Sequence, residues 1–573
     1  MATLIDLPQK QTRQYAFCVI LLASLTLLPL LGIIDYNTLA EPREAVVPQS
    51  MLQTGNWVLP INNGGDIAYK PPLFHWAVAL CSLPQGEVSE FSSRLPSALA
   101  AIALVLYSFF FFSRRGKPQT ALIAAVCLLA NFEFHRTAMS CRVDMLLTFC
   151  IVASIGELYK WAAERHLRGV PVLAVLLMSG GMLTKGFVGI VIPLMVVAVY
   201  MWLRGAGFWP VVWRWALLGV GALLLPACWY YAAWLQGGDG FLYMVYEENV
   251  LRFLGKMPYA SHEHGPFYYV PQLLSGLLPW TFVFLAGLLT VKAATWRSVR
   301  VWTRVWWTDF WKKLRERPSA ELLSWLAVVL IVVFYLIPKS KRSVYLLPIY
   351  PFVAYLTALL IDYLQQFHRK YLQGCVALMA GVITLAFLGT FLMQMGLFPK
   401  TWFEGLGLGD AISAYARALE GTNWTFFVAV LVAIYAFYAL STLRRQTHQL
   451  LYNALLGFLL LDAFVLPPLL NAKSDKTCAV RIAEYTTERP VYSFIDEHTG
   501  MVHFYQINFY LKGGVVPFDA EAEKGYLLVG EKDVRVFAER YPDVRLEEVI
   551  DFQHKSHDNR HNLQNLLLYA FSR

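Results

Sequence analysis

Charged side chains gather in a few polar segments of this otherwise apolar chain, and they are of the types that bind phosphate groups and transfer protons. The first of these segments runs from Asp35 to Pro72 and holds several carboxylates together with Arg43 and Lys70. Lysine and arginine bind phosphate oxygens, and a carboxylate serves as an acid, a base or an electrostatic partner. Such a mixture at a membrane surface suits an anionic lipid substrate. A solvated rim of interface residues would have the same composition, so the residue types alone leave both interpretations open.

The elements that must position these groups are membrane spans. The chain has 573 residues, of which 57% are hydrophobic and 15% are charged, whereas soluble chains carry about 25% charged residues. Apolar runs recur that are long enough to cross a hydrocarbon core of about 30 Å. These runs are continuous rather than alternating, which indicates helices. The composition therefore predicts an all-α polytopic membrane protein.

The apolar runs predict thirteen transmembrane helices. With the N-terminus placed inside, the loops that carry most lysines and arginines also fall inside, as the positive-inside rule requires. The net charge of +9 then comes from inner loops, and we expect the basic run 292–317 to meet anionic lipid heads rather than nucleic acid. The predicted spans are 15–34, 95–112, 118–132, 143–159, 170–184, 186–203, 213–235, 271–291, 319–337, 343–363, 373–395, 423–442 and 450–470.

Two long loops, 35–94 and 236–270, fall outside in this topology. The apolar piece 71–84 is too short to span, so we expect a juxtamembrane helix in which His75 is packed rather than catalytic. Charged residues near a membrane are costly unless they are used. The outer polar residues are Asp35, Glu41, Arg43, Glu44, Asp66, Lys70, Arg136, Arg142, Asp144, Lys185, Glu247, Glu248, Arg252, Lys256, His262, Glu263, His264, Lys339, Lys341, Arg342 and Tyr345.

The composition becomes that of a soluble domain from about Asn471. The sequence therefore predicts a membrane domain over 1–470 and a small α/β domain over 471–573, which the odd number of spans places outside. No glycine-rich phosphate loop occurs in it, so we expect a lid or docking module. Helices are predicted at 474–485, 503–511 and 534–541, and strands at 491–495, 515–518, 526–529, 544–550 and 562–571.

Five polar sequence blocks lie in order along the chain and together cover it from about residue 35 to residue 351. The blocks are the first loop from Asp35 through Lys70-Pro-Pro to Arg94-Leu-Pro96, Cys141-Arg142-Val-Asp144, Thr184-Lys185-Gly186, the stretch from Glu248 to Trp280, and Lys341-Arg342 through Tyr345 to Pro351. These blocks resemble those of bacterial GT-C membrane glycosyltransferases of the aminoarabinose transferase and protein mannosyltransferase-like group, and their order makes the resemblance specific.

The resemblance implies a GT-C fold and a polyprenyl-phosphate sugar donor. Fixed cations would stabilise the departing lipid phosphate. By matching position, the expected catalytic residues are Asp35, with Glu41 as the fallback carboxylate, Asp144 and Lys70. The expected substrate-binding residues are Arg43, Tyr69, Arg142, Lys185, Arg252, His264, Lys339, Lys341, Arg342 and Tyr345.

Two positions depart from the family pattern. The head of the first loop reads Asp35-Tyr36 where the family often has Asp-Glu, which leaves one acid there. The residue before the loop lysine is Tyr69, whereas the aminoarabinose enzymes have an acid that helps to hold a metal. A divalent metal is therefore in question, although His262 and His264 could still serve as ligands, and we assign no metal site.

The leading hypothesis is a glycosyltransferase of the bacterial inner membrane, with a cytoplasmic N-terminus and a periplasmic C-terminal domain. It would transfer a sugar from undecaprenyl phosphate to lipid A or another lipopolysaccharide component. An alternative with the same chemistry is a protein O-glycosyltransferase. A multipass lipid or sugar transporter is less favoured, because the charges collect at the outer ends of spans rather than at the bilayer midplane.

Overall fold

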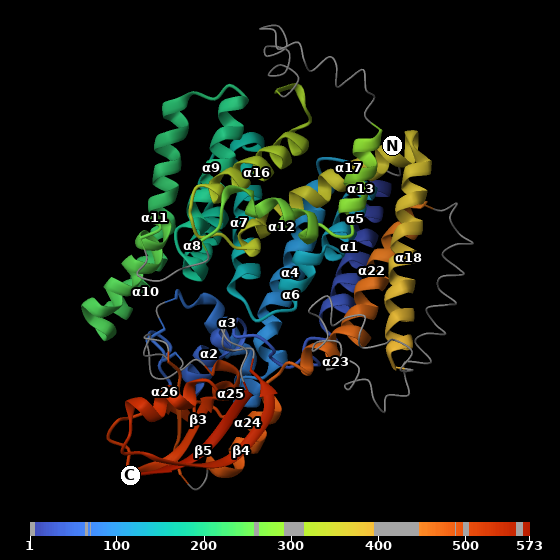
Figure 1. Cartoon of the computed structure of the whole chain (residues 1–573). Coiled ribbons are helices and arrows are strands. Elements are labelled where there is room, and N and C mark those ends of the chain that lie inside the picture. Colours follow the sequence, from blue (N-terminus) through green and yellow to red (C-terminus); the bar gives the residue numbers. More distant parts are fainter. Residues whose placement is uncertain are drawn as a thin grey trace.

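Helices make up the first part of the chain and a small sheet the last part (Figure 1). The computed structural model describes residues 6–62, 67–68, 70–256, 263–290, 315–394, 446–486, 489–496, 504–556 and 565–573. The α-helices before the sheet are α1 Asp6–Leu27, α2 Pro42–Thr54, α3 Leu73–Ser82, α4 Glu90–Ser113, α5 Pro118–Leu129, α6 Phe132–Ala138, α7 Val143–Tyr159, α8 Val172–Lys185, α9 Val188–Leu203, α10 Phe208–Tyr246, α11 Arg252–Leu254, α12 Tyr269–Gly276, α13 Thr281–Leu289, α16 Ser319–Leu336, α17 Tyr350–Phe367, α18 Arg369–Gln394, α22 Gln446–Leu460 and α23 Leu466–Asn471.

Within the described residues, six helical segments are long and apolar enough to cross a membrane. The number rises to eight if each of two bent helix pairs forms one span. Many apolar side chains of α10, such as Leu217 and Leu224, are exposed, as expected for a helix that faces lipid. The count of thirteen spans stays a prediction, because the expected span 423–442 lies outside the described residues and α8 and α9 are shorter than a usual span.

The best buried helices are α4, α7 and α17, which form the centre of the helical part together with α5. Helix α4 packs on α5 and α7, and α7 packs on α8. A capping box of Ser89 and Ser92 starts α4 by satisfying backbone N–H groups that the helix leaves open. The first turn of α7 and the last turn of α8, which packs on this central group, both contribute charged residues to the candidate site.

The first loop contains two short helices, α2 and α3. Helix α2 begins with Pro42, whose fixed φ suits the first position of a helix, and places Arg43 and Glu44 in its first turn. The predicted helix at 71–84 is present as α3, and His75 is buried within it. The two helices pack on one another and α3 also packs on α4, which ties this loop to the helical centre.

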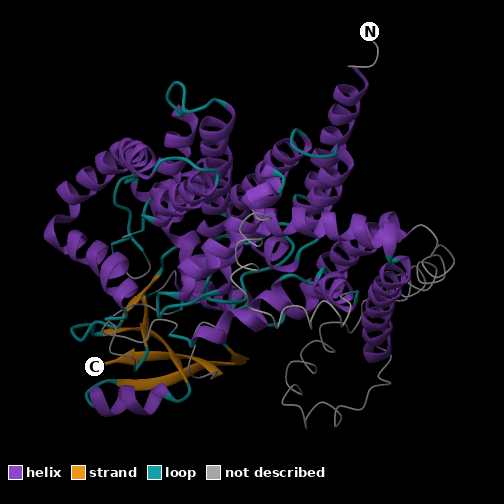
Figure 2. Cartoon of the chain, turned by 90° about the horizontal axis from the view of Figure 1, so that it is seen from above, coloured by secondary structure: helices purple, strands orange, loops and turns teal. Residues whose placement is uncertain are grey.

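The predicted C-terminal α/β unit is present, with helices and strands near each predicted place. Its sheet has the order β2-β1-β3-β5-β4, in which β1 is parallel to β2 and β3, and β5 is antiparallel to β3 and β4. The strands lie together on one side of the molecule (Figure 2). The elements are α24 Lys476–Thr486, β1 Val491–Phe494, α25 Tyr505–Tyr510, β2 Val515–Pro517, β3 Lys524–Gly530, α26 Asp533–Arg540, β4 Arg545–Lys555 and β5 Asn565–Ser572.

Alternate residues of β3 face the two sides of this sheet, as the pleat requires. Tyr526 and Leu528 belong to the cluster that contains the buried residues of α24 and α25, whereas Leu527 and Val529 pack with Phe537 of α26. Helix α25 also packs against α2 of the first loop. The C-terminal unit therefore lies against α2 and α3 (Figure 1).

Candidate active site

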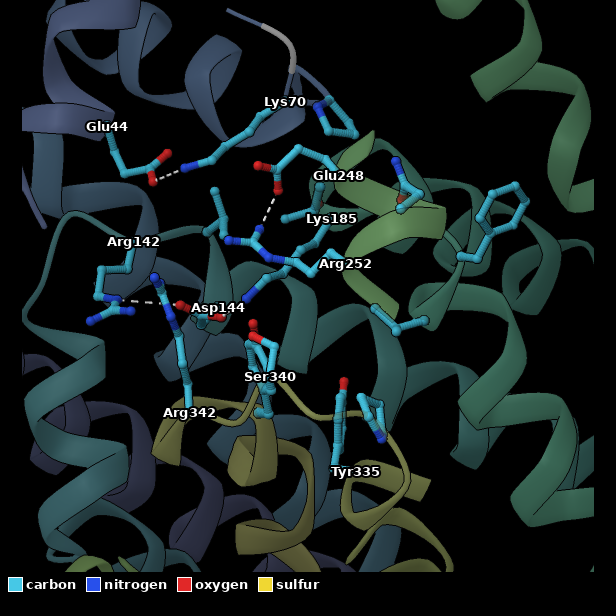
Figure 3. A pocket seen from close by; sticks show the side chains of 18 of the residues that line it. Glu44, Lys70, Arg142, Asp144, Lys185, Glu248, Arg252, Tyr335, Ser340 and Arg342 are labelled. Atoms are coloured by element: carbon cyan, nitrogen blue, oxygen red, sulfur yellow. Dashed lines mark hydrogen bonds and ion pairs between the residues drawn. The ribbon is translucent and has the colours of Figure 1, made fainter. Parts of the chain in front are cut away.

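A cavity of about 520 Å³ lies where the first loop meets the ends of α7, α8 and α16 (Figure 3). This size is within the usual range for small-molecule sites. Its cationic lining residues are Arg43, Lys70, Arg142, Lys185, Arg252 and Arg342. Its acidic lining residues are Glu44, Asp144 and Glu248. Positive side chains thus exceed negative ones by three, which favours an anionic ligand.

The first wall of the cavity consists of Arg43, Glu44 and Lys70, and we call it the Glu44 wall. The carboxylate of Glu44 is buried and forms ion pairs with Lys70 and, at 3.6 Å, with Arg43. Its other oxygen lies 3.0 Å from Nε2 of His75 on α3. Burial alone would raise the pKa of Glu44, but Lys70, His75 and Arg43 outweigh it and hold the pKa well below its ordinary value. Glu44 is therefore a fixed anion and a weak base.

Lys70 has an unusual pKa for an ammonium group. Burial and the neighbouring Arg43 lower the pKa of Lys70 to about 8, although Glu44 acts in the opposite direction. A lysine in this state carries its charge at neutral pH and loses it within a mildly alkaline range. An anion that bound here would raise the pKa of Lys70 again and keep its charge to higher pH, so the site favours a negatively charged group.

The second wall consists of Arg142, Asp144 and Lys185, and we call it the Asp144 wall. Asp144 lies in the first turn of α7, where the helix dipole favours a carboxylate. It pairs with Lys185 and, at 3.3 Å, with Nε of Arg142. The ammonium of Lys185 also lies 4.7 Å from the centre of the Tyr345 ring, within the range of a cation–π contact.

The position of Lys185 depends on the tight turn between α8 and α9. Lys185 is the last residue of α8, and Gly186 follows with φ +85°, a conformation that favours glycine. The two helices approach so closely that a Cβ atom on Gly181 would lie 2.9 Å from the Cα atom of Gly189. Two glycines therefore allow the backbone contact that places Lys185 at the cavity.

The remaining lining comes from residues 248–252 and 334–345. Glu248 and Arg252 form an ion pair one helical turn apart. Burial lowers the pKa of Arg342; Tyr345 opposes this shift, while Arg43, Arg142 and Arg252 add to it. Ser340 is buried, and its hydroxyl has no hydrogen-bond partner among the described residues. Arg342 thus lies among cations, an arrangement that a bound anion would stabilise.

One side of the cavity is apolar. It is lined by Phe187, Val188 and Val191 at the start of α9 and by Phe334 near the end of α16. Phe187 and Val191 are exposed on the surface of the helical part. The cavity therefore joins a charged interior to an apolar outer surface, as an amphiphilic ligand with an anionic head requires.

Several predicted site residues meet at this cavity. They are Lys70, Asp144, Arg43, Arg142, Lys185, Arg252, Arg342 and Tyr345. Tyr69 lies outside the described residues. Glu44, Glu248, Ser340 and Tyr335 also line the cavity but were not among the predicted site residues. The position of Glu44 directly after Arg43 was a usable signal for it, whereas the sequence held no signal for Tyr335.

The two first-loop acids that were expected to be catalytic lie elsewhere. The carboxylate of Asp35 accepts a hydrogen bond from Lys476 of the C-terminal unit at 2.7 Å. Glu41 binds Arg94 with both oxygens, at 2.8 and 3.0 Å, and accepts the backbone N–H of Cys141 at 2.7 Å. Because these contacts occupy both carboxylates outside the cavity lining, the geometry gives Asp35 and Glu41 positioning contacts and brings neither to the cavity.

Three predicted cation and histidine positions are also outside the lining. Lys341 is buried and donates to the carbonyl oxygens of His264 and Pro338, at 3.1 and 2.6 Å. The backbone carbonyl of Lys339 accepts the N–H of His264, and the His264 ring stacks on Tyr268 with centroids 4.2 Å apart. These contacts hold the 338–342 turn in place. Of the three cations in this turn, Lys339, Lys341 and Arg342, it is Arg342 that lines the cavity.

The described residues do not fit a metal centre. Among them, no group of three His, Cys, Asp or Glu side chains could hold a metal ion. His264 is engaged with Tyr268, and the positions of Tyr69 and His262 fall outside the described part of the chain. We therefore derive no step through a metal.

The chain is similar in sequence to a described protein family and to several known proteins. The family described as "Dolichyl-phosphate-mannose-protein mannosyltransferase" matches residues 69–234. An undecaprenyl phosphate-alpha-4-amino-4-deoxy-L-arabinose arabinosyl transferase of Shewanella sediminis is 26% identical over 416 residues, which cover 69% of this chain and 71% of the relative. A transferase of the same description from Pseudomonas aeruginosa is 26% identical and covers 66% of both chains.

A solved structure shares the fold over nearly the whole chain. The crystal structure of ArnT from Cupriavidus metallidurans bound to undecaprenyl phosphate has a TM-score of 0.68 and 18% sequence identity, and the match covers 98% of each chain. At this identity the likeness establishes the fold, and the substrate must be argued from the cavity.

Proposed function

We propose that the chain is a GT-C membrane glycosyltransferase of the group that includes aminoarabinose transferases and protein mannosyltransferase-like enzymes, and that it transfers a sugar from a polyprenyl phosphate to an acceptor outside the inner membrane. The observation that carries this proposal is the excess of cations in a cavity with one apolar side. The relatives from Shewanella and Pseudomonas are named for a sugar linked to undecaprenyl phosphate, which supports the same class of donor.

The cations fit the charge that develops in this reaction. The acceptor oxygen forms a bond to the anomeric carbon while the bond from that carbon to the phosphate oxygen breaks. The lipid phosphate leaves with the bonding electron pair, so its charge grows from one negative charge to two. Lys70, Arg43 and Arg342 are placed to stabilise this added charge, and preorganised cations in a partly dry site lower such a barrier.

The state of the carboxylates favours a phosphate as the acceptor. All three lining carboxylates are in ion pairs, and the low pKa of Glu44 makes it a poor base. A hydroxyl acceptor needs a base to remove its proton, whereas a phosphate oxygen is already anionic at neutral pH. We therefore assign the acceptor as a phosphate group of lipid A or a related glycolipid, with Asp144 orienting Lys185 and Arg142.

Mass spectrometry of lipid A, core glycan and periplasmic glycoproteins tests this function. Cells with the gene should carry a sugar on a lipid A or glycan phosphate that cells without the gene lack, and the purified protein should form it from an undecaprenyl phosphate-linked sugar. Sugar found only on secreted proteins would make the chain a protein O-glycosyltransferase. Substrate that is translocated but left unmodified would make it a transporter.

Donor binding should weaken as the pH rises past about 8, because Lys70 loses its proton there. The donor is a phosphodiester that does not titrate in this range, so the change in affinity comes from the protein. The affinity for the donor should fall by up to about tenfold per pH unit. The measurement is the KM for the donor across neutral and alkaline pH.

Lys70→Arg is the control for this profile, because arginine keeps its proton throughout the range. The variant should bind the donor with no break near pH 8. A break that persists in Lys70→Arg would assign the titration to another group.

A further inference from the structure

Glu41, Arg94 and Tyr36 form a connected group beside the cavity, which we call the Glu41 bridge. The Arg94 guanidinium binds Glu41 with two nitrogens and donates to the backbone carbonyls of Leu31 and Ile34. It lies 5.3 Å from the centre of the Tyr36 ring, and the Tyr36 hydroxyl is hydrogen-bonded to Ser93. Arg94 is 3% exposed and Tyr36 is fully buried, whereas the Glu41 side chain is 13% exposed, so most of the group is shielded from water.

The Glu41 bridge touches both charged walls of the cavity through the backbone. Glu41 directly precedes α2, and its carbonyl oxygen accepts the N–H groups of Glu44 and Ala45. One oxygen of its side chain accepts the N–H of Cys141, the residue before Arg142. A single partly buried residue therefore joins the start of the Glu44 wall, through its backbone carbonyl, to the start of the Asp144 wall, through its carboxylate.

The C-terminal unit packs against the Glu41 bridge at Tyr36. Phe509 of α25 is buried, and its ring meets the Tyr36 ring edge-on with centroids 4.8 Å apart. It shares one apolar cluster with Ala45, Val47 and Met51 of α2 and with Val143 of α7. The hydroxyl of the next residue, Tyr510, accepts the N–H of Tyr36 at 3.1 Å and donates to Glu90 at 3.0 Å.

A second set of contacts holds the same unit in place. Lys476 of α24 donates to Asp35 at 2.7 Å and to Glu90 at 2.9 Å. The backbone N–H of Asp35 donates to the side-chain oxygen of Asn471 at 2.8 Å. The C-terminal unit is thus attached to the first loop at Asp35, which precedes Tyr36, and at Glu90, near the end of the loop.

We propose that the C-terminal unit, acting through the Glu41 bridge, sets the spacing between the Glu44 wall and the Asp144 wall. Phe509, Tyr36, Arg94 and Glu41 are positioning residues in this device, and none of them lines the cavity. The inference rests on the proposed function, because it assigns the two walls to one departing phosphate. It explains why a soluble unit remote from the reacting atoms belongs to the transferase.

The spacing matters because the two walls must act on one group at the same time. Stabilisation of a developing charge depends on cations fixed before the reaction, and a misplacement of about 1 Å can cost about 10²-fold in rate. Loss of the Phe509 ring would let α2 relax away from the start of α7. The expected effect is on the rate of the chemical step more than on binding of the donor.

Phe509→Leu in the full-length protein tests the device. We expect kcat for sugar transfer to fall about tenfold while the KM for the donor changes by less than about twofold. We also expect the break in the pH profile to move upward from about 8, because water reaches Lys70 as α2 relaxes. A purely structural role in the C-terminal unit would lower protein yield without moving that break.

Phe537→Leu is the matched control. Phe537 is also buried but packs on the opposite face of the sheet, with Leu527 and Val529. It should leave kcat and the pH break unchanged. Phe509→Leu combined with Glu41→Gln should lose less activity than the product of the two single effects, as expected for residues in one path.

The outcomes separate this inference from the proposed function. If Lys70→Met is inactive, two results would overturn the positioning role. One is normal turnover in Phe509→Leu, and the other is an equal effect of Phe509→Leu and Phe537→Leu. Normal turnover in Lys70→Met would instead overturn the cavity as the donor site. Arg94→Lys, which keeps the charge but loses the two-point contact with Glu41, should behave as Phe509→Leu does.

Discussion

Replacing Lys70 by methionine should lower kcat for sugar transfer by about 10²- to 10³-fold, the usual cost of removing one fixed group that stabilises a developing anion. Methionine keeps the length and apolar stem of lysine and removes its charge. Glu44 keeps His75 and Arg43 as partners, so α2 should hold its place. Single-turnover transfer from a labelled undecaprenyl phosphate-linked sugar measures the effect.

The matched control for this variant is Lys256→Met, which removes an exposed lysine outside the cavity lining. It should transfer at the wild-type rate. Lys70→Arg should retain part of the activity, because it restores a cation with a different shape. Turnover within a few fold of wild type in Lys70→Met would remove Lys70 from the donor site.

Asp144→Asn should lower kcat/KM by about 10²-fold, whereas Asp35→Asn should lower it by less than about fivefold. Asp144 holds Lys185 and Arg142 together, and its loss leaves two neighbouring cations without their common partner. The Asp35 contact with Lys476 is partly exposed, and an asparagine oxygen can still accept that hydrogen bond. Kinetics at saturating and limiting donor concentrations separate binding from turnover.

This pair of variants decides between two assignments of the acidic group. The family pattern favours Asp35 as the catalytic carboxylate, and the geometry favours Asp144. An inactive Asp35→Asn beside a normal Asp144→Asn would place the reaction at the head of the first loop. Membrane insertion should be the same in both, which detergent extraction and size-exclusion chromatography would check.

Much of the fold followed from local patterns. The periodic elements after Asn471 were predictable because alternation and turn residues are short-range signals, and β1, β3 and α26 appear near their predicted positions. The bend of 67° between α5 and α6 was not predictable, because the predicted span 118–132 ends at the first residue of α6 and does not show how the chain turns there. Hydropathy shows which segments are apolar and says little about where a helix bends.

The sequence predicted which cations line the site, but it did not show which carboxylates do. Lys70, Lys185 and Arg342 were identified from their sequence blocks, and all three line the cavity. Asp35 and Glu44 lie nine residues apart in one polar loop, and their residue types do not show which of the two carboxylates reaches the cavity. Their fates are set by contacts with distant partners: Asp35 meets Lys476, 441 residues later in the chain, and Glu44 meets His75 on the next helix.

The glycine contact between α8 and α9 has a consequence for motion. Gly181 and Gly189 meet backbone to backbone, so no side chain at that point can change rotamer and let the helices slide. The turn that carries Lys185 is thereby the stationary side of the cavity. The opposite side, α2, is instead held by side chains of the C-terminal unit, so the separation of the two charged walls depends on how that unit packs against α2.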